Sequence, residues 1–577
     1  MSEHDLVIRG GSVVDGNGGA PVTADVAVDD GVVTAVGRDV GRGRREIDAD
    51  GAVVAPGFVD IHTHYDGQAT WDERLLPSAW HGVTTVVMGN CGVGFAPVVP
   101  EHHQRLIDLM EGIEDIPGTA LHEGLDWSWS SFDDYLAALE ARPHDIDFAT
   151  QVPHAALRVH VMGERAESGR AATADDIAAM AKLARAAVEA GALGFTTSRT
   201  LNHRSVTGEL TPSYDAGVDE LVGIAGELGA AGKGVMQLVT DFIDVDVDFN
   251  VMLSMVKASG RPLSFSLAQS PLAKETYLEV LRRLADANAE GLPLRAQVAA
   301  RGVGLLMGLA CTLHPFMTNP AWKRIAGMPI AEQVEIMRDP AFKEQVLAAH
   351  TKEKNANLIG GRLIDKYHVM YELTDPPNYE PDPRDSIAER ARREGRTPED
   401  LVYDVLLADN GYAMVYVTSL NYADGNLDAV HTMLADPHTI PGLSDGGAHV
   451  GTICDVSFPT TLLEHWVRER DHDRLPLEFV VQRQARDTAH AVGLDDRGVL
   501  APGYKADINV LDIDRVRLRR PEMRFDLPGG GRRLLQRAEG YRHTIVSGRE
   551  VYRDGEPLDA LPGRLVRGAQ PAPSVSG

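Results

Sequence analysis

From residue 56 onward, short β-branched runs alternate with amphipathic helical stretches, and this alternation limits the fold more than any other feature of the chain. One helical stretch opens at Thr173, an N-cap type of residue followed by acidic residues, and it ends at Gly191. Repeated strand–helix units over several hundred residues favour a closed parallel barrel over an open sheet. We therefore predict an α/β fold, a (β/α)8 TIM-type barrel over residues 56–499, with strands that include 147–152, 194–197, 234–239, 262–267 and 293–298.

Both ends of the chain show a different pattern, in which short strands are separated by Gly/Asp turns. Residues 1–55 hold too few strands to close a sandwich alone, and residues 500–560 offer candidate partner strands. We expect these two segments to build one small β-sandwich domain next to the barrel. Residues 561–577 are expected to form a flexible tail.

The barrel pattern is interrupted between residues 300 and 410, where a charged helical stretch is followed by a Pro-rich one. This segment follows a barrel strand on the side where active sites form. One interpretation is a lid that encloses the substrate, and the other is a surface insertion that extends a dimer contact. The strand-like residues 413–417 are not assigned to either part.

The bulk composition narrows the class of partner. The chain has 577 residues and a formal net charge of −28, whereas nucleic-acid binding needs clustered Lys and Arg, so no nucleic-acid partner is expected. Three cysteines make no disulfide framework, and neither a signal peptide nor an apolar run long enough to cross a bilayer is recognisable. We expect a cytoplasmic protein without a membrane partner, and a homo-oligomer is compatible with these features.

Three strand ends carry candidate metal ligands. Residues 57–64, GFVDIHTH, end an apolar run in His62 and His64, which point to the same side of a strand because side chains alternate. A second strand ends at Cys91 in a Gly/Asn turn, and Asp445 follows another strand end. Such ends meet at one rim of a barrel, where imidazole, thiolate and carboxylate can share a divalent ion, and the thiolate favours zinc over magnesium. Asp445 would then serve as general base and general acid.

These motifs carry a family resemblance. GFVDIHTH, HGVTTVVMGNCGVGFAP, ALRVHVMG, GLSDGGAH and RGVLAPGYKADINVLD resemble the amidohydrolase superfamily, and within it the N-acyl-D-amino-acid deacylases (D-aminoacylases). The resemblance runs from about residue 5 to about residue 555 and is poor over 300–410. It implies a barrel with a β-domain built from both termini, and a metal-dependent hydrolase of a C–N (amide-type) bond in a small-molecule substrate.

The chain departs from this family at several positions. D-aminoacylases hold zinc tightly with the Cys and two further histidines, at positions where this chain has Val239 and Leu267. A family Lys and a family Tyr that belong to the substrate site fall at Gln269 and Gln297. The resemblance therefore does not extend to the tightly bound zinc site, nor to the groups that would neutralise a substrate carboxylate.

We therefore predict one divalent metal ion, zinc before other metals, held mainly by His62, His64 and Asp445, with Cys91 close or bridging. The substrate need not be an N-acyl-D-amino acid, because the loop after Asp445 offers no Arg before Arg468. For the histidines outside the HxH motif, a hydrogen-bonded structural role is favoured over metal ligation. The candidate substrate contacts are His154, Gln269, Gln297 and His449.

Two other functions are compatible with the same residues. In a metal-poor hydrolase, Cys91 would be the nucleophile and a histidine such as His154 the base, which requires a lowered thiol pKa and an adjacent imidazole. In a non-catalytic binding protein, the barrel would be kept and the site lost, an interpretation motivated by the missing imidazoles at 239 and 267. Retention of His62, His64 and Asp445 together weighs against the second alternative.

Overall fold

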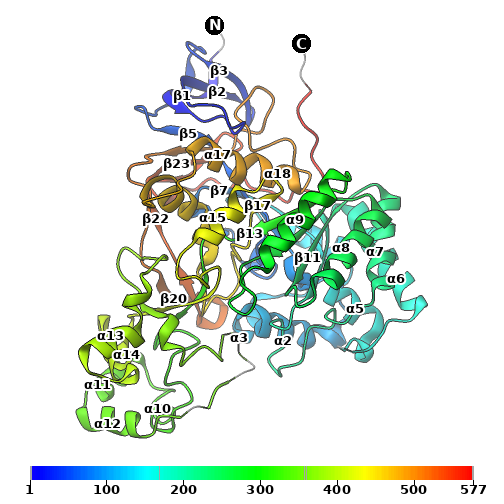
Figure 1. Cartoon of the computed structure of the whole chain (residues 1–577). Helices are drawn as coiled ribbons and strands as arrows, with labels where there is room; N and C mark the ends of the chain where they lie inside the picture. Colours follow the sequence, from blue (N-terminus) through cyan, green and yellow to red (C-terminus); the bar gives the residue numbers. More distant parts are fainter. Residues whose placement is uncertain (1–2, 168, 352, 356–357, 359, 575–577) are drawn as a thin grey trace.

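A closed barrel of parallel strands occupies the centre of the molecule (Figure 1). The computed structural model describes residues 3–167, 169–351, 353–355, 358 and 360–574. The last barrel strand returns to the first, since His64 N–H donates to the Gly446 carbonyl at 2.7 Å and Asp445 N–H donates to the His62 carbonyl at 3.0 Å. Because β8 and β9 are two halves of one strand, the described residues form a ring with eight strand positions. Its strands are β6 (Phe58–Asp60), β7 (Val83–Met88), β8 (Asp147–Thr150), β9 (Val152–Pro153), β10 (Gly194–Arg199), β11 (Val235–Thr240), β12 (Leu263–Leu267), β13 (Leu294–Val298) and β17 (Thr439–Pro441).

Helices cover the outside of the ring, as the sequence pattern predicts. The helix that opens at Thr173 is α6, and Asp176 and Thr173 cap each other there: Asp176 N–H donates to Thr173 Oγ1 at 3.2 Å and Thr173 N–H to Asp176 Oδ2 at 2.9 Å. Its apolar face is buried against the barrel, and it ends at Gly191, whose φ of 123° suits glycine. The outer helices are α5 (His154–Met162), α6 (Ala174–Ala190), α7 (Val218–Ala231), α8 (Val245–Ser259), α9 (Thr276–Ala289) and α15 (Asp428–Ala435).

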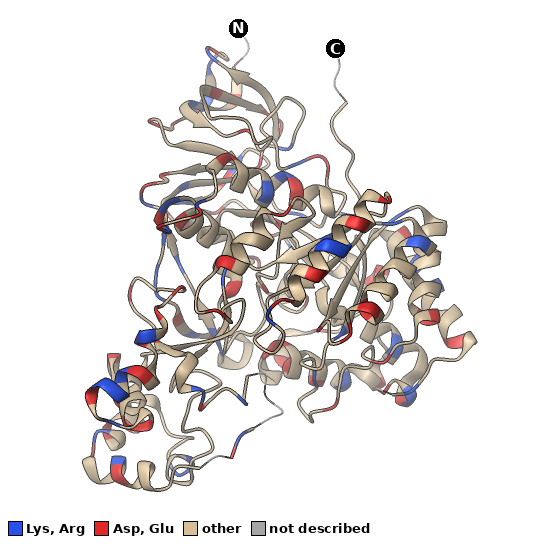
Figure 2. Cartoon of the chain, in the orientation of Figure 1, with Lys and Arg blue, Asp and Glu red and all other residues tan. Residues whose placement is uncertain are grey.

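Other helices connect the barrel strands at the rim. Between β7 and β8 the chain forms α2 (His103–Glu114), α3 (Gly118–Gly124) and α4 (Phe132–Glu140). After β17 come α16 (Phe458–Thr461), α17 (Leu477–Gln482) and α18 (Thr488–Ala491). Lys and Arg alternate with Asp and Glu along the outer helices, as Figure 2 shows for α9, where Arg282 lies 2.8 Å from both Glu279 and Asp286.

Both termini build one β-domain, which lies at the top of Figure 1. A single nine-stranded sheet joins them, with β18 pairing antiparallel to β5. Strand β1 bends at a bulge near Gly10 and pairs with β4 before it and with β5 after it, so the sheet folds around its own apolar core. The strands are β1 (His4–Val13), β2 (Val22–Asp29), β3 (Val32–Gly37), β4 (Gly43–Asp48), β5 (Val53–Pro56), β18 (Ile508–Leu511), β23 (Tyr541–Val546), β24 (Arg549–Arg553) and β25 (Glu556–Pro557).

A hairpin between β18 and β23 leaves this sheet and reaches the barrel rim. It consists of β20 (Glu522–Leu527) and β21 (Gly531–Leu535), and β19 (Arg517–Leu518) pairs with β22 (Ala538–Glu539) at its base. Leu534 N–H donates to the carbonyl of Val450 at 2.6 Å, which ties the hairpin to the loop after β17. Residues 500–560 were expected in the accessory domain, and nothing in their sequence pattern indicates that this hairpin reaches the barrel.

The segment after β13 has an apolar core of its own and projects to the lower left of Figure 1. Strand β16 lies between β14 and β15 and pairs antiparallel with both, which places the unassigned strand at 413–417. Ile453, from the loop after β17, packs into this core. The elements are β14 (Val303–Met307), α10 (Pro320–Lys323), α11 (Ile330–Met337), α12 (Pro340–Ala348), β15 (Met370–Glu372), α13 (Ile387–Glu394), α14 (Pro398–Leu407) and β16 (Val415–Leu420).

The expectation of a flexible tail from residue 561 is wrong for residues 563–570. Gly563 N–H donates to the His144 carbonyl and Val566 N–H to the Phe148 carbonyl, both at 2.8 Å, and Leu565 and Val566 are buried. The composition of the tail gives no indication of these few apolar residues, which pack beside β8. Among the described residues, no helix has the length and apolar character needed to span a membrane.

Candidate functional site

The rim of the barrel brings four predicted side chains together. His62 and His64 follow β6, Cys91 follows β7, and Asp445 follows β17. His62 Nε2 lies 3.3 Å from Cys91 Sγ and 3.4 Å from Asp445 Oδ1, and His64 Nε2 lies 3.6 Å from the same carboxylate oxygen. Residues separated by up to several hundred positions thus present their donor atoms to one small volume.

Unusual backbone conformations aim two of these side chains inward. Cys91 has a φ of 55° and Asp445 a φ of 51°, in the left-handed region that side-chain-bearing residues seldom adopt. The turn at Cys91 is held by its own N–H, which donates to Gln237 Oε1 at 3.1 Å. Gly92 N–H donates to Thr196 Oγ1, also at 3.1 Å. Two neighbouring barrel strands therefore stabilise a strained turn that directs the thiol into the barrel.

Burial sets the protonation of the imidazole and the thiol. Burial lowers the pKa of His62 to about 4, so its ring is neutral at physiological pH. Its Nδ1 lies 2.6 Å from Gln297 Oε1, while Gln297 Nε2 donates to Ser264 Oγ. With the amide oriented this way, Nδ1–H donates and Nε2 keeps its lone pair for an ion. Burial raises the pKa of the Cys91 thiol to about 12, so it ionises only beside a cation.

The donor set fits a divalent metal ion. Ligand atoms of His62, His64 and Cys91 all lie within 4.8 Å of one another. Both ring nitrogens of His64 and both oxygens of Glu114 are buried without a hydrogen-bond partner among the described residues, although such groups are normally satisfied. A tetrahedral zinc site separates its nitrogen and sulfur ligand atoms by roughly 3.3–3.6 Å. The separation of 3.3 Å between His62 Nε2 and Cys91 Sγ matches this spacing, and the soft sulfur favours zinc.

Glu114 is a site residue that the sequence analysis missed. It ends α2, and its Oε1 lies 3.4 Å from His64 Nδ1 while its Oε2 lies 3.5 Å from His449 Nε2. The His449 N–H also donates to the Glu114 carbonyl, which fastens the loop after β17 to the helix. Burial raises the pKa of Glu114 to about 7. An acidic residue next to the buried Ile113, at the end of an amphipathic helix, was the only signal.

The positions of the two missing family histidines are filled by apolar side chains. Leu267 is buried in the barrel core and Val239 packs against it. Gln237, two residues before Val239, faces the site instead and accepts the hydrogen bond from Cys91. Asp241, the other nearby candidate ligand, is engaged by Thr200 Oγ1 and the N–H of Leu201. The site therefore differs from the family pattern on the side of β11 and β12.

His154 lies outside the cluster. Its Nδ1 is 2.8 Å from Thr197 Oγ1 and its Nε2 is 2.9 Å from Glu220 Oε1, and Arg158 binds the same carboxylate. With both ring nitrogens engaged in this buried network, His154 has neither a free nitrogen for a substrate nor a contact with Cys91. The proposed pair of a Cys91 nucleophile and a His154 base is therefore not assembled.

Gln269 is also held away from the predicted site. Its Nε2 donates to Asp424 Oδ2 at 2.7 Å, its Oε1 accepts from Ala423 N–H, and its own N–H donates to Asn421 Oδ1. Gln269 thus fastens the loop after β16 to the barrel. Of the four candidate substrate contacts, Gln297 and His449 lie beside the metal-ligand cluster, and His154 and Gln269 do not.

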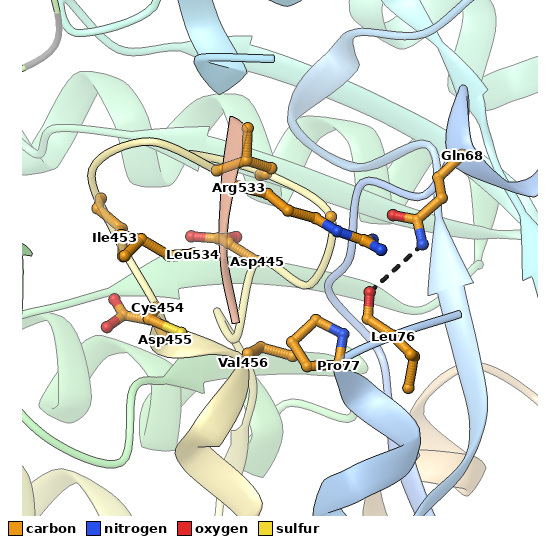
Figure 3. A pocket seen from close by; sticks show the side chains of 13 residues that line it. Gln68, Leu76, Pro77, Asp445, Ile453, Cys454, Asp455, Val456, Arg533 and Leu534 are labelled. Atoms are coloured by element: carbon orange, nitrogen blue, oxygen red, sulfur yellow. Dashed lines mark hydrogen bonds between the residues drawn. The ribbon is translucent and has the colours of Figure 1, made fainter. Parts of the chain in front are cut away.

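A pocket leads to the cluster from the side of Asp445 (Figure 3). The Asp445 side chain is 19% exposed, whereas those of His62 and His64 are at most 1% exposed. Asp445 is therefore the member of the cluster that faces the pocket. The pocket is lined by Gln68, Leu76, Pro77, residues of the loop 445–456, and Arg533 and Leu534 of β21.

Comparison with known proteins agrees with this architecture. The amidohydrolase family matches residues 45–552. N-acyl-D-aspartate deacylase of Alcaligenes xylosoxydans xylosoxydans is 28% identical over 573 residues, covering 98% of this chain and 95% of that protein. A structure of D-aminoacylase with a binuclear metal centre has a TM-score of 0.65 at 25% identity, covering 98% of this chain and 100% of that chain.

A structure of N-acyl-D-glutamate deacylase from Bordetella bronchiseptica, complexed with zinc and a phosphonate inhibitor, has a TM-score of 0.65. It covers 98% of this chain and 100% of that chain at 24% identity, so this likeness concerns the fold alone. The family match spans most of the chain and both of its domains. The chain belongs to the amidohydrolase family, and it is a metal-dependent hydrolase of amide-type carbon–nitrogen bonds other than peptide bonds.

Proposed function

We propose that this hydrolase cleaves the amide bond of an N-acyl-D-amino acid with one zinc ion, held by His62, His64 and Asp445 with Cys91 as a soft fourth donor. One observation carries the proposal: Asp445 Oδ1 lies 3.4 Å and 3.6 Å from the two Nε2 atoms while its side chain is open to the pocket. A zinc ion bound there would lower the pKa of a bound water to about 7 and polarise an amide carbonyl.

The side chains divide the remaining work. Asp445 takes a proton from the attacking water and returns it to the leaving nitrogen, because it is the exposed carboxylate of the cluster. Gln297 accepts from His62 Nδ1–H and so orients that ring, and the Glu114 carboxylate, 3.4 Å from His64 Nδ1, favours one orientation of the second ring. Burial of these groups excludes bulk water and strengthens their interaction with developing charge.

The substrate class rests on the relatives and on the pocket. Two of the similar proteins are named N-acyl-D-aspartate deacylase and D-aminoacylase. The pocket beside Asp445 combines apolar side chains such as Leu76 and Val456 with the cation Arg533, which suits an acylated amino acid. We assign the D configuration on the relatives alone.

Metal analysis and one substitution test the assignment. The purified protein should hold about one equivalent of zinc, and Asp445→Asn should lower kcat by at least a hundredfold, as expected for loss of a general base, while His62→Ala should release the ion. Hydrolysis of N-acetyl-D- and N-acetyl-L-amino acids should then show a preference for the D series. Undiminished turnover by Asp445→Asn, or a protein that retains zinc without His62, would contradict the roles assigned here.

We also propose that the insertion, residues 300–410, helps to enclose the substrate rather than extend a dimer contact. Thr312 Oγ1 donates to Asp115, the residue after Glu114, and Ile453 of the pocket packs in the insertion core. Cys91, Cys311 and Cys454 are all unpaired, which supports a reducing compartment such as the cytoplasm. Sedimentation analysis and turnover are measured on the same protein sample. Turnover by a protein that sediments as a monomer would favour substrate enclosure over a role in dimerisation.

A further inference from the structure

Strand β21 delivers an arginine to the pocket from a segment that is remote in sequence from the barrel. Arg533 lines the same pocket as Asp445 and is only 6% exposed (Figure 3). The hydrogen bond from Leu534 N–H to the Val450 carbonyl fixes the strand beside the loop that carries Asp445. This backbone contact holds the strand that carries Arg533 against the pocket wall.

Only part of the guanidinium is used by the protein itself. Arg533 Nε donates to Asp526 Oδ1 at 2.7 Å and Nη2 donates to Asp526 Oδ2 at 3.0 Å. The third nitrogen, Nη1, is buried without a hydrogen-bond partner among the described residues. Guanidinium groups stay charged and buried donors are normally paired, so Nη1 is a cationic donor that a bound anion would satisfy.

The neighbouring charges do not compete for this donor. Asp455, the other acidic residue of the pocket wall, lies 3.0 Å from Arg301 Nη1. Asp445 faces His62 and His64. The remaining walls are largely apolar, with Leu76, Pro77, Val450, Ile453, Val456 and Leu534.

We propose that Arg533 Nη1 binds the carboxylate of the substrate, so the enzyme selects amides that carry a free carboxylate beside an apolar group. The inference rests on the proposed function and assigns the residue that recognises the carboxylate of its substrate. Because Asp526 occupies Nε and Nη2, the carboxylate is bound through Nη1 alone. A carboxylate bound there is held on the same pocket wall as Asp445, the residue that acts on the amide.

Paired substrates test the proposal. N-acetyl-D-leucine carries the carboxylate, and N-acetyl-D-leucinamide replaces it with a neutral amide, so acetate release from each is followed with the zinc-loaded enzyme. Arg533→Gln should lower kcat/KM for N-acetyl-D-leucine at least tenfold, mainly through KM, and change the neutral analogue by less than about twofold. Arg533→Lys should recover part of the loss because it restores the charge.

The neighbouring Arg532→Gln is the matched control, since Arg532 Nη2 donates to Thr312 outside the pocket lining. Equal losses of kcat/KM on both substrates in Arg533→Gln would show that the residue is structural and would overturn the proposal. A wild-type enzyme that does not prefer the substrate with the carboxylate would overturn it as well. If the wild type cleaves neither compound, the proposed function is wrong. Calorimetry with N-acetyl-D-leucine then tests the anion site by binding, independently of turnover. At least tenfold weaker binding to Arg533→Gln supports the anion site, and equal or undetectable binding to both proteins overturns it.

Discussion

Glu114 Oε1 lies 3.4 Å from Nδ1 of His64, on the side of the imidazole away from Asp445. Burial opposes a charge on His64, but Glu114 and Asp445 together raise its pKa well above the usual value. A carboxylate behind a metal-ligating imidazole fixes the ring orientation and makes the ligand more basic. Glu114 therefore acts on the candidate metal site through His64.

Replacing Glu114 by Gln should weaken zinc binding by about 10- to 100-fold, because the amide removes the negative charge that supports His64. Zinc titration with a competing chelator measures this change, and saturating zinc should restore much of the turnover. Glu111→Gln, one turn earlier on α2, is the matched control. Unchanged zinc affinity in Glu114→Gln would show that His64 does not need this partner.

Replacing Cys91 by Ser should reduce the preference for zinc over manganese, since the softest donor of the cluster is lost. Metal content after dialysis against an equimolar mixture of the two ions measures the preference. Cys311→Ser removes another buried thiol and serves as the control. A variant that still selects zinc as the wild type does would place Cys91 outside the coordination sphere.

Replacing His154 by Asn should lower stability and leave the metal content unchanged. The substitution breaks a buried network with Thr197 and Glu220, a change that costs about 1–3 kcal/mol. Thermal unfolding and zinc analysis on the same preparation measure both effects. Lost turnover with an unchanged Tm would instead support a role of His154 as a catalytic base.

The sequence predicts the parts of this site that local patterns encode. His62 and His64 follow from the alternation of side chains along one strand, and the barrel follows from repeated strand–helix units. Cys91 and Asp445 also follow predicted strand ends and match motifs of the D-aminoacylases, but their inward orientation depends on turns with positive φ that no periodicity reveals. Each of these residues lies at the end of a barrel strand.

Glu114 and Arg533 could not be predicted in this way, because neither follows a barrel strand. Glu114 ends a helix, and its role depends on how the loop of His449 packs against that helix. Arg533 comes from a hairpin of the C-terminal segment, well beyond the loop after Asp445, where a carboxylate-binding Arg was expected. Tertiary docking, rather than local sequence, decides which residues of such segments reach the pocket.

Glu380 lies in a partly buried ionic cluster with His465 and Arg470, which follow α16. Its Oε2 lies 2.9 Å from His465 Nε2 and 3.3 Å from Arg470 Nε, and its Oε1 accepts from Leu427 N–H at 2.8 Å. Burial alone would raise the pKa of Glu380, but the contacts with His465 and Arg470 lower it to about 2. The carboxylate is thus charged in the folded protein at any physiological pH.

Replacing Glu380 by Gln should destabilise the protein by about 2–3 kcal/mol at pH 7, with a pH dependence that identifies the cause. A carboxyl group whose pKa is lowered by folding contributes its full stabilisation above the pKa of the unfolded chain, near 4.3, and loses it as the pH falls toward the folded value of about 2. The difference in Tm between the wild type and Glu380→Gln should therefore be constant from pH 7 to about 5 and narrow below that. Glu372→Gln removes a more exposed partner of Arg390 and should change Tm much less. A Tm difference that stays the same down to pH 3 would show that packing, rather than the charge of Glu380, holds these segments together.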